Sequence, residues 1–333
     1  MPICPCFPYA FFPSCLFFEA DPEVGKVKYV KKPGVSDSLC NSWTLIVGGT
    51  AGIGRAIAVA MAKAGSNVAV VGSSAAKGKD VVQKMKTCGT LATQQFDAYA
   101  ADLLTVKGCL DFISKLKEGA IQFDYLVFTV GTWPDKEMRT TADGIDKVFA
   151  LDVLARFTIT EGMTQGPQPL LKPKARILSV LASTHKFPPA PTIDKMKSIV
   201  STEGEVYSTL QILATAGVCM DAWLQHAGIR HPGITFIGTF PGIVGTDLVK
   251  TSKTFPSCLR PILACGQQMV ASRPEDSGNF HLQILTSPNA ACRPTSYFNS
   301  LQLEGRRANP KAYDEDFCRW LWAFLETTMA KYR

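Results

Sequence analysis

The segment Leu45–Ala58, which reads LIVGGTAGIGRAIA, constrains the fold of this chain more than any other. A short apolar run leads into a glycine-rich turn, and an Ala- and Ile-rich stretch without proline follows. Gly48, Gly52 and Gly54 occupy positions where a strand-to-helix turn needs a tight bend, close approach to a phosphate, and close packing of helix on strand. The start of the helix then offers free N–H groups to an anion. The pattern predicts a dinucleotide-binding turn that includes Ile53.

Strand-like and helix-like segments alternate along the rest of the chain. The strands are expected as short, continuous apolar runs, which are typical of a parallel sheet buried on both faces: residues 44–47, 67–71, 94–99, 125–129, 176–180 and 235–239. Helices are expected over residues 54–64, 78–87, 106–118, 143–165, 205–226 and 313–331. The alternation predicts an α/β fold with a doubly wound parallel sheet, a Rossmann fold, in a single domain.

The first 18 residues are apolar and uncharged, but they contain four prolines, which argue against a helix. A signal peptide has basic residues before its apolar run, and none is present here. The run is also short for a membrane span. We therefore expect residues 1–40 to be an apolar extension that contains proline and cysteine, and residues 41–333 to be the catalytic domain. Membrane contact through residues 1–20 is the alternative.

Composition narrows the function classes. Hydrophobic residues make up 46% and charged residues 19% of the 333 residues, and the net charge of +7 is scattered along the chain, so no nucleic-acid tract is expected. The 11 cysteines have no metal-ligand or disulfide spacing. We therefore expect reduced thiols in a cytoplasmic protein, without a metal site.

From the glycine turn onward the chain resembles the short-chain dehydrogenase/reductase family, whose TGxxxGxG turn reads VGGTAGIG here. Asp102 and Leu103 match the family's Asp-Leu pair beside the adenine. Gly131 closes FTVG, where the family has Asn-Ala-Gly, and Thr246 follows the Pro-Gly segment in FPGIVGTDL. The match covers roughly residues 42–330, and the layout is more similar to retinol-dehydrogenase-like and divergent fungal members than to compact ones.

The resemblance implies hydride transfer between a nicotinamide cofactor and a carbonyl or alcohol. Ser183, after the strand RILSV, would hold the substrate oxygen, and Tyr207 would donate or accept its proton. An ordinary tyrosine titrates near pH ~10, so the family uses a lysine four residues later on the same helix face to lower the tyrosine pKa.

The chain departs from this pattern at several positions. Gln211 stands at the lysine position, and Asp152 stands where the family has a supporting asparagine. Strict alignment of the catalytic serine falls on Ala182, with Ser183 one residue later and Ser179 three residues earlier. Two hypotheses follow: an oxidoreductase in which Tyr207 still protonates the carbonyl oxygen, or a non-catalytic dinucleotide-binding sensor or scaffold.

Asp152 also lies four residues before Arg156 on an expected helix. This is the spacing of a simple ion pair, and we favour that interpretation for both residues.

The end of the second strand distinguishes the cofactors. It reads VVGSSAAKGK, with no acidic residue to bond the ribose of NAD. Ser73, Ser74 and Lys77 favour the 2′-phosphate of NADP(H), with NAD as the alternative. The serines could instead only cap the next helix.

The substrate is expected to be a small carbonyl or alcohol. Residues 249–270 are apolar, which favours a lipophilic substrate, although an ordinary packed helix pair would read the same way. The sequence is also compatible with a homo-oligomer.

Overall fold

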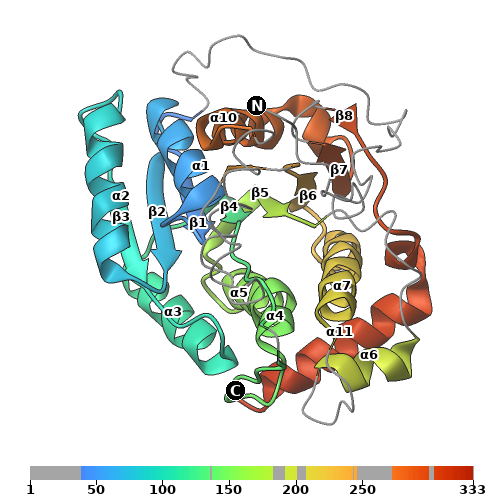
Figure 1. The fold of residues 1–333 in the computed structure, drawn as a ribbon. Coiled ribbons are helices and arrows are strands. Elements are labelled where there is room, and N and C mark those ends of the chain that lie inside the picture. The colour runs from blue at the N-terminus through green and yellow to red at the C-terminus, as the bar shows by residue number, and fades with distance from the viewer. Residues whose placement is uncertain are drawn as a thin grey trace, which may run out of the picture.

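The computed structural model describes residues 39–135, 137–182, 192–200, 208–242, 244–245, 272–299 and 304–332. These residues form one eight-stranded sheet in the order β3-β2-β1-β4-β5-β6-β7-β8, with helices on both faces (Figure 1). All neighbouring strands are parallel except β7 and β8. The predicted α/β class with a doubly wound sheet is confirmed. The boundary between residues 1–40 and 41–333 stays a prediction, because residues 1–38 lie outside the described part.

All six predicted strands are present, within a few residues of their expected ends. The strands read as continuous apolar runs because both faces of the sheet are covered; in β2, for example, every residue is buried. Two strands at the far edge were not predicted. The strands are β1 (Trp43–Val47), β2 (Asn67–Gly72), β3 (Phe96–Ala100), β4 (Phe123–Phe128), β5 (Leu171–Val180), β6 (Thr235–Phe240), β7 (Thr295–Asn299) and β8 (Glu304–Gly305).

The predicted helices are also present, but two begin later than expected. The prediction of one helix over 143–165 was wrong at its start, because Asp146 caps the first turn through its carboxylate. The prediction over 205–226 was wrong for the same kind of reason: Ser208 is extended (φ −117°, ψ 114°) and caps the helix through its hydroxyl. The longer helices are α1 (Gly52–Lys63), α2 (Ala75–Cys88), α3 (Val106–Glu118), α5 (Ala155–Thr164), α6 (Ile193–Val200), α7 (Thr209–Arg230), α10 (Pro274–Thr286) and α11 (Glu315–Ala330).

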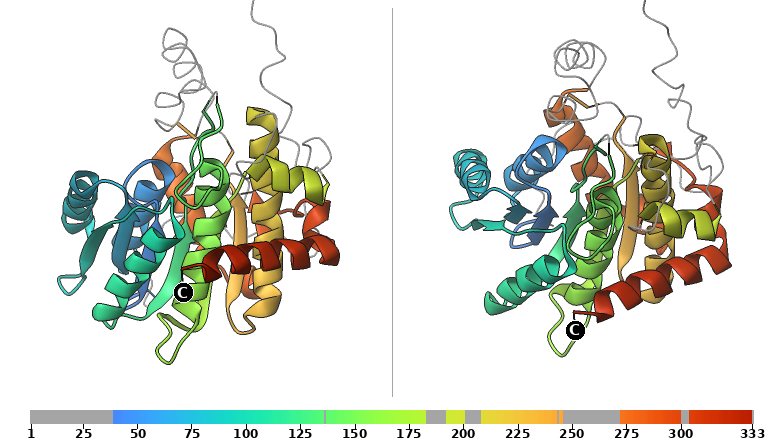
Figure 2. Two further views of the ribbon diagram at one scale, coloured as in Figure 1. Left: turned by 90° about the horizontal axis from the view of Figure 1, so that it is seen from below. Right: turned by 60° about the horizontal axis from the view of Figure 1, so that its bottom comes forward.

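The sheet separates two apolar cores. One face packs against α1, α2 and α10, and the other against α3, α5, α7 and α11. Figure 2 shows α11 running across α5 and α7, and the edge-to-face contact of Trp322 with Phe157, at 5.1 Å between ring centroids, joins α11 to α5. No helix of the described segments is long and apolar enough to cross a membrane.

Helices α1 and α10 lie side by side on their face of the sheet (Figure 1), although more than 200 residues separate them in the sequence. A Cβ on Gly278 of α10 would lie 2.6 Å from the backbone oxygen of Ala56 in α1, so the helices touch closely. One turn further, His281 is fully buried. Its Nδ1 contacts the Ser277 oxygen at 2.6 Å, and its Nε2 has no hydrogen-bond partner within the described residues.

His281 makes the fold sensitive to acid. Burial lowers the pKa of its imidazole from 6.5 to about 4. The unfolded chain therefore binds more protons than the folded chain between these values, and stability is lost as the pH falls from 6.5 towards 4. We expect His281 to account for a loss on the order of 3 kcal/mol over this window. Urea unfolding at pH 7 and pH 4.5 checks this: His281→Leu should lose less stability than the parent, and equal losses would contradict it.

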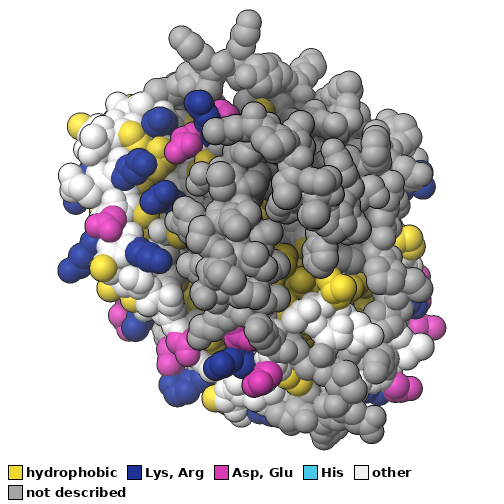
Figure 3. Space-filling view, viewed as in Figure 1, with side chains coloured by type: hydrophobic (Ala, Val, Ile, Leu, Met, Phe, Trp, Pro, Cys, Tyr) yellow, Lys and Arg dark blue, Asp and Glu magenta, His cyan; other side chains and the backbone are white. Residues whose placement is uncertain are grey.

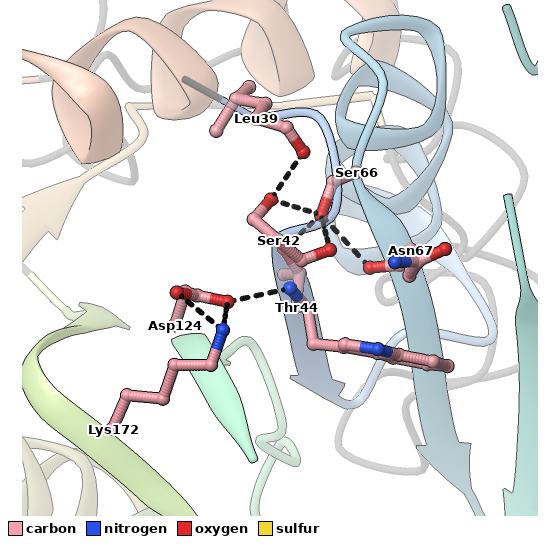
Figure 4. A network of polar contacts seen from close by, with 8 residues as sticks. Leu39, Ser42, Thr44, Ser66, Asn67, Asp124 and Lys172 are labelled. Atoms are coloured by element: carbon pink, nitrogen blue, oxygen red, sulfur yellow. Dashed lines mark hydrogen bonds and ion pairs between the residues drawn. The ribbon is translucent and has the colours of Figure 1, made fainter. Parts of the chain in front are cut away.

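At the amino ends of the strands, a network of polar contacts holds the start of the domain (Figure 4). The Ser42 hydroxyl donates to the Leu39 oxygen at 2.7 Å, and the Ser66 hydroxyl lies 2.9 Å from that of Thr44. Nearby, Asp124 accepts the Trp43 N–H at 2.8 Å and pairs with Lys172 at 2.8 Å. The polar groups at this edge therefore serve the fold.

Candidate functional site

The Gly48–Gly54 turn lies at the carboxyl end of β1, and its backbone requires glycine. Gly48 has φ +89° and Gly52 has φ +50°, both in the left-handed region. A Cβ on Gly48 would lie 2.6 Å from the Val130 nitrogen, and one on Gly54 would lie 2.4 Å from the Gly48 oxygen. The turn, the end of β4 and the start of α1 are therefore packed as closely as backbone allows.

Helix α1 begins in this turn without a capping side chain. Its N-cap is Ala51, which has no side-chain acceptor, whereas Ser74 caps α2 and Thr105 caps α3. The first N–H groups of a helix have no partner within it, and together with the helix dipole they form a site for an anion. The turn fits the pyrophosphate of a dinucleotide in its backbone shape and in its available donors.

The position of the turn in the sheet agrees with this fit. The strand order reverses between β1 and β4, and such reversals open a crevice at the carboxyl ends of the strands. The backbone N–H groups of Thr129 and Val130 donate to the Val47 oxygen at 2.8 and 3.1 Å, which holds the end of β4 beside the turn. Gly131 follows and is exposed. Ile53 lies in the turn itself, and the roles of Ile53 and Gly131 in cofactor binding stay predictions.

The end of β2 lies on the other side of the turn. The Thr50 side chain packs over Gly72, where a Cβ would approach its hydroxyl to 2.4 Å. The two serines that follow have different roles. Ser74 accepts the Lys77 N–H at 3.3 Å and caps α2, as the alternative interpretation predicted. Ser73 is exposed and is not the cap, so it is the serine that can meet a ligand.

The Asp102-Leu103 pair lies after β3. Leu103 is buried in the core, whereas Asp102 is exposed and its carboxylate accepts the Leu104 N–H at 3.0 Å. The chain is tight here, because a Cβ on Gly108 would lie 1.9 Å from the Asp102 oxygen. The pair is held in a tight turn after β3, and its place beside the adenine stays a prediction.

Three predicted site residues, Ser183, Tyr207 and Thr246, lie outside the described residues, and their roles stay predictions. Gln211 is exposed in the first turn of α7, which begins after the extended, capping Ser208.

Ser179 is fully buried in β5, and its hydroxyl accepts a hydrogen bond from Arg156 at 2.5 Å. Arg156 also donates to the Val130 oxygen at 2.6 Å and weakly to the Phe128 oxygen at 3.4 Å. The guanidinium thus joins α5 to the ends of β4 and β5 from within the protein. The Ser179 hydroxyl is therefore bound to this arginine inside the protein.

The expected simple ion pair between Asp152 and Arg156 was wrong, because the hydrogen bonds of Arg156 go to β4 and β5. Asp152 lies on a π-helical turn (Ala150–Leu154) that precedes α5, and its Oδ1 accepts the Thr132 N–H at 3.2 Å. Burial raises the pKa of Asp152 from 3.8 to about 7, against the opposing effects of the Arg156 charge and this hydrogen bond. Nothing in the sequence showed that Asp152 would bind the backbone after β4 while Arg156 bonds to the end of β4 and to Ser179 of β5.

The comparison with known families agrees with this geometry: the sequence pattern of the family described as short chain dehydrogenase matches residues 42–189. This part of the chain is therefore similar to the short-chain dehydrogenase/reductase family. The match begins just before β1 and includes the glycine turn, Gly131, Asp152 and β5.

Curated relatives come from the branches that the layout indicated. Retinol dehydrogenase 13 of Homo sapiens is 22% identical over 84% of this chain and 82% of its own length. Hydroxynaphthalene reductase arp2 of Aspergillus fumigatus is 26% identical over 78% of this chain and 91% of its own. Polyprenol dehydrogenase of Homo sapiens is 26% identical over 62% of each chain. The chain spans 56–63% of the length of the first relatives that it matches.

Solved structures show the same fold. A short chain dehydrogenase from Burkholderia cenocepacia, solved in complex with NADP, covers 79% of this chain and 98% of its own at 19% identity, with a TM-score of 0.59. Within the described part of this chain, no group of three His, Cys, Asp or Glu side chains could hold a metal ion.

Proposed function

We propose that this protein is an oxidoreductase that transfers a hydride between NADP(H) and a carbonyl or alcohol substrate. The observation that carries the proposal is the turn at Gly48, Gly52 and Gly54, which leaves no room for a side chain, together with the uncapped start of α1. This arrangement lies at the reversal of strand order, where dinucleotides bind in open α/β sheets. The cofactor, when bound, supplies or accepts the hydride.

The preference for NADP(H) over NAD rests on charge. No acidic residue follows β2, and the exposed Ser73 and Lys77 stand where a 2′-phosphate would be received. Figure 3 shows Lys and Arg side chains along the side of the molecule formed by α2, which carries Lys77, Lys79, Lys84 and Lys86. Such a field attracts a cofactor that carries an additional phosphate. NAD is the alternative cofactor.

For the proton, we assign Tyr207 to donate to the carbonyl oxygen and Ser183 to hold that oxygen. A neutral tyrosine is an adequate acid for reduction, so this assignment does not depend on a lysine. The substrate class is a lipophilic carbonyl or alcohol. Support comes from the apolar segment 249–270 and from the relatives, whose names refer to polyprenol, retinol and hydroxynaphthalene.

A second candidate function is a sensor or scaffold that binds a dinucleotide without turnover. Gln211 favours it, because an amide at the position of the family's lysine supplies no charge to Tyr207. Both functions need cofactor binding, so only turnover separates them.

The test measures NADPH consumption by its absorbance with a panel of lipophilic ketones, aldehydes and quinones. We expect Tyr207→Phe to reduce kcat by at least about 100-fold, because a positioned acid contributes 10²–10⁴-fold. NADPH affinity should stay the same. Tyr99→Phe, on the edge strand β3, is the matched control and should keep the parent rate. An unchanged rate in Tyr207→Phe would remove that residue from the mechanism, and binding without turnover of any substrate would establish the second function.

We place the protein in the cytoplasm, with a small-molecule substrate, no nucleic-acid partner and a homo-oligomer as its assembly. The cysteines within the described residues are free thiols, which supports a reducing compartment. Association with a membrane through residues 1–20 is the alternative location.

A further inference from the structure

The carboxylate of Asp152 lies directly beneath an exposed glycine at the crevice. A Cβ on Gly131 would lie 3.0 Å from Asp152 Oδ1, and Gly131 itself is exposed. The Thr132 N–H fixes the carboxylate there at 3.2 Å. Because residue 131 has no side chain, a ligand on this part of the crevice approaches an ionisable group closely.

The sheet topology indicates which half of a dinucleotide comes to this place. The adenosine half lies on the β2 side of the glycine turn, where the residues that select between cofactors follow the strand. The pyrophosphate lies at the turn itself, after β1. The other half of the dinucleotide therefore extends over the ends of β4 and β5, where Gly131 and Asp152 lie.

The net charge of Asp152 and Arg156 together changes by one unit when Asp152 gains or loses a proton. Arg156 is nearly fully buried and is held by Val130 and Ser179. With Asp152 ionised, the two charges cancel, and with Asp152 protonated, the arginine charge remains. An oxidised nicotinamide ring carries a positive charge that the reduced ring lacks, so the two cofactor forms respond differently to this change.

We propose that Asp152 couples the redox state of the bound cofactor to a proton: the protein releases a proton from Asp152 when it binds the oxidised cofactor and keeps that proton when it binds the reduced one. The proton passes from the carboxyl group to solvent and leaves a carboxylate, with no transfer of electrons. The inference rests on the proposed function, since it requires a nicotinamide dinucleotide in the crevice.

The neighbouring ionisable groups are consistent with this coupling. Burial raises the pKa of Asp152 to about 7, Arg156 lowers it, and Asp146 before the π-helical turn raises it. On α7, which packs against that turn, the ionisable side chains are Cys219, Asp221, His226 and Arg230. Burial raises the pKa of the Cys219 thiol well above its ordinary value, so this thiol is neutral near pH 7.

The direction of the effect follows from linkage. A positive ring near Asp152 favours its ionised form and lowers its pKa, so oxidised cofactor binds more tightly as the pH rises through 7. A decrease of one pKa unit on binding changes the affinity up to about tenfold across the window. Reduced cofactor carries no ring charge and should show little of this dependence.

The experiment measures the dissociation constants of NADP⁺ and NADPH at pH 6, 7 and 8 with the full chain. Both forms carry the 2′-phosphate, so its titration affects both dissociation constants equally and drops out of their ratio. For the parent we expect the ratio of the NADP⁺ constant to the NADPH constant to fall about five- to tenfold from pH 6 to pH 8. In Asp152→Asn, which keeps an acceptor for the Thr132 N–H, the ratio should stay constant within about twofold.

Asp124→Asn is the matched control, because Asp124 also accepts a backbone N–H through its carboxylate, but at the opposite edge of the sheet. It should behave as the parent. Should Asp152→Asn not fold, calorimetry of the parent at pH 7 gives the same answer. The binding enthalpy is measured in phosphate and in Tris, and a difference between the two buffers reports a released proton. The difference should appear with NADP⁺ and not with NADPH.

The outcomes separate the two proposals. A ratio that does not depend on pH, or that depends on it equally in Asp152→Asn, would overturn the coupling while leaving cofactor binding intact. Failure to bind either cofactor would overturn both the coupling and the proposed function. A ratio that changes in the parent and in Asp124→Asn but not in Asp152→Asn would establish the coupling.

Discussion

Replacing Gly54 with valine is expected to reduce NADPH affinity by at least about 100-fold. A Cβ at this position would lie 2.4 Å from both the Gly48 oxygen and the Thr129 hydroxyl. One of these contacts is backbone, so α1 has to move away from the glycine turn, and its N–H groups then no longer point at the pyrophosphate. Overpacking of this kind costs about 1–3 kcal/mol in stability, in addition to the lost binding.

NADPH fluorescence titration measures the affinity, and thermal unfolding measures the stability. Gly119→Ala is the control, because a Cβ there makes only ordinary contacts, the nearest at 3.5 Å from the Leu116 oxygen. It should bind NADPH as the parent does. If Gly54→Val bound NADPH with parental affinity, the crevice at β1 would not be the dinucleotide site.

The second large effect is expected at Asp221, in the middle of α7. Asp221 and Arg306 are both buried, with 3.8 Å between a carboxylate oxygen and a guanidinium nitrogen, and Asp221 also accepts the Asn309 N–H at 2.9 Å. Asp221→Ala removes the carboxylate and leaves the arginine charge in the core. Breaking a buried pair from one side costs about 3–5 kcal/mol.

Urea unfolding followed by circular dichroism checks this value. Asp111→Ala is the control, because its ion pair with Lys107 is exposed and is worth less than about 1 kcal/mol. The double variant Asp221→Ala, Arg306→Met should lose less stability than Asp221→Ala alone, because it removes the buried charge as well. A loss in Asp221→Ala no larger than that of Asp111→Ala would contradict the assigned role.

The central strands could be predicted because burial on both faces produces uninterrupted apolar runs, as in β2. The same rule missed β7, which reads TSYFN and begins with two polar residues although four of its five residues are buried. It missed α10 because Pro274–Thr286 contains Ser277, Gly278 and His281 on its buried side. These small and polar residues pack closely against α1, and their fit depends on a partner that is distant in the sequence.

In the site, the glycine turn could be predicted because its constraint is local: the bend, the phosphate and the helix start lie within seven residues. The role of Arg156 could not. It depends on the pairing of β4 with β5, which places Ser179 beside Phe128 and thus within reach of the guanidinium. The later start of α7 was equally hidden, because Ser208 caps a helix only if the chain is extended there.

The contact of α10 with α1 has a consequence for synthesis of the chain. Ribosomes add about 5–20 residues each second, and about 220 residues separate the start of α1 from the start of α10. The apolar side of α1 around Ala56 therefore emerges tens of seconds before Gly278 and its neighbours exist to cover it. During that interval the apolar side of α1 is exposed, and a chaperone could bind it. A chain that ends before residue 274 lacks α10 and would keep this surface exposed.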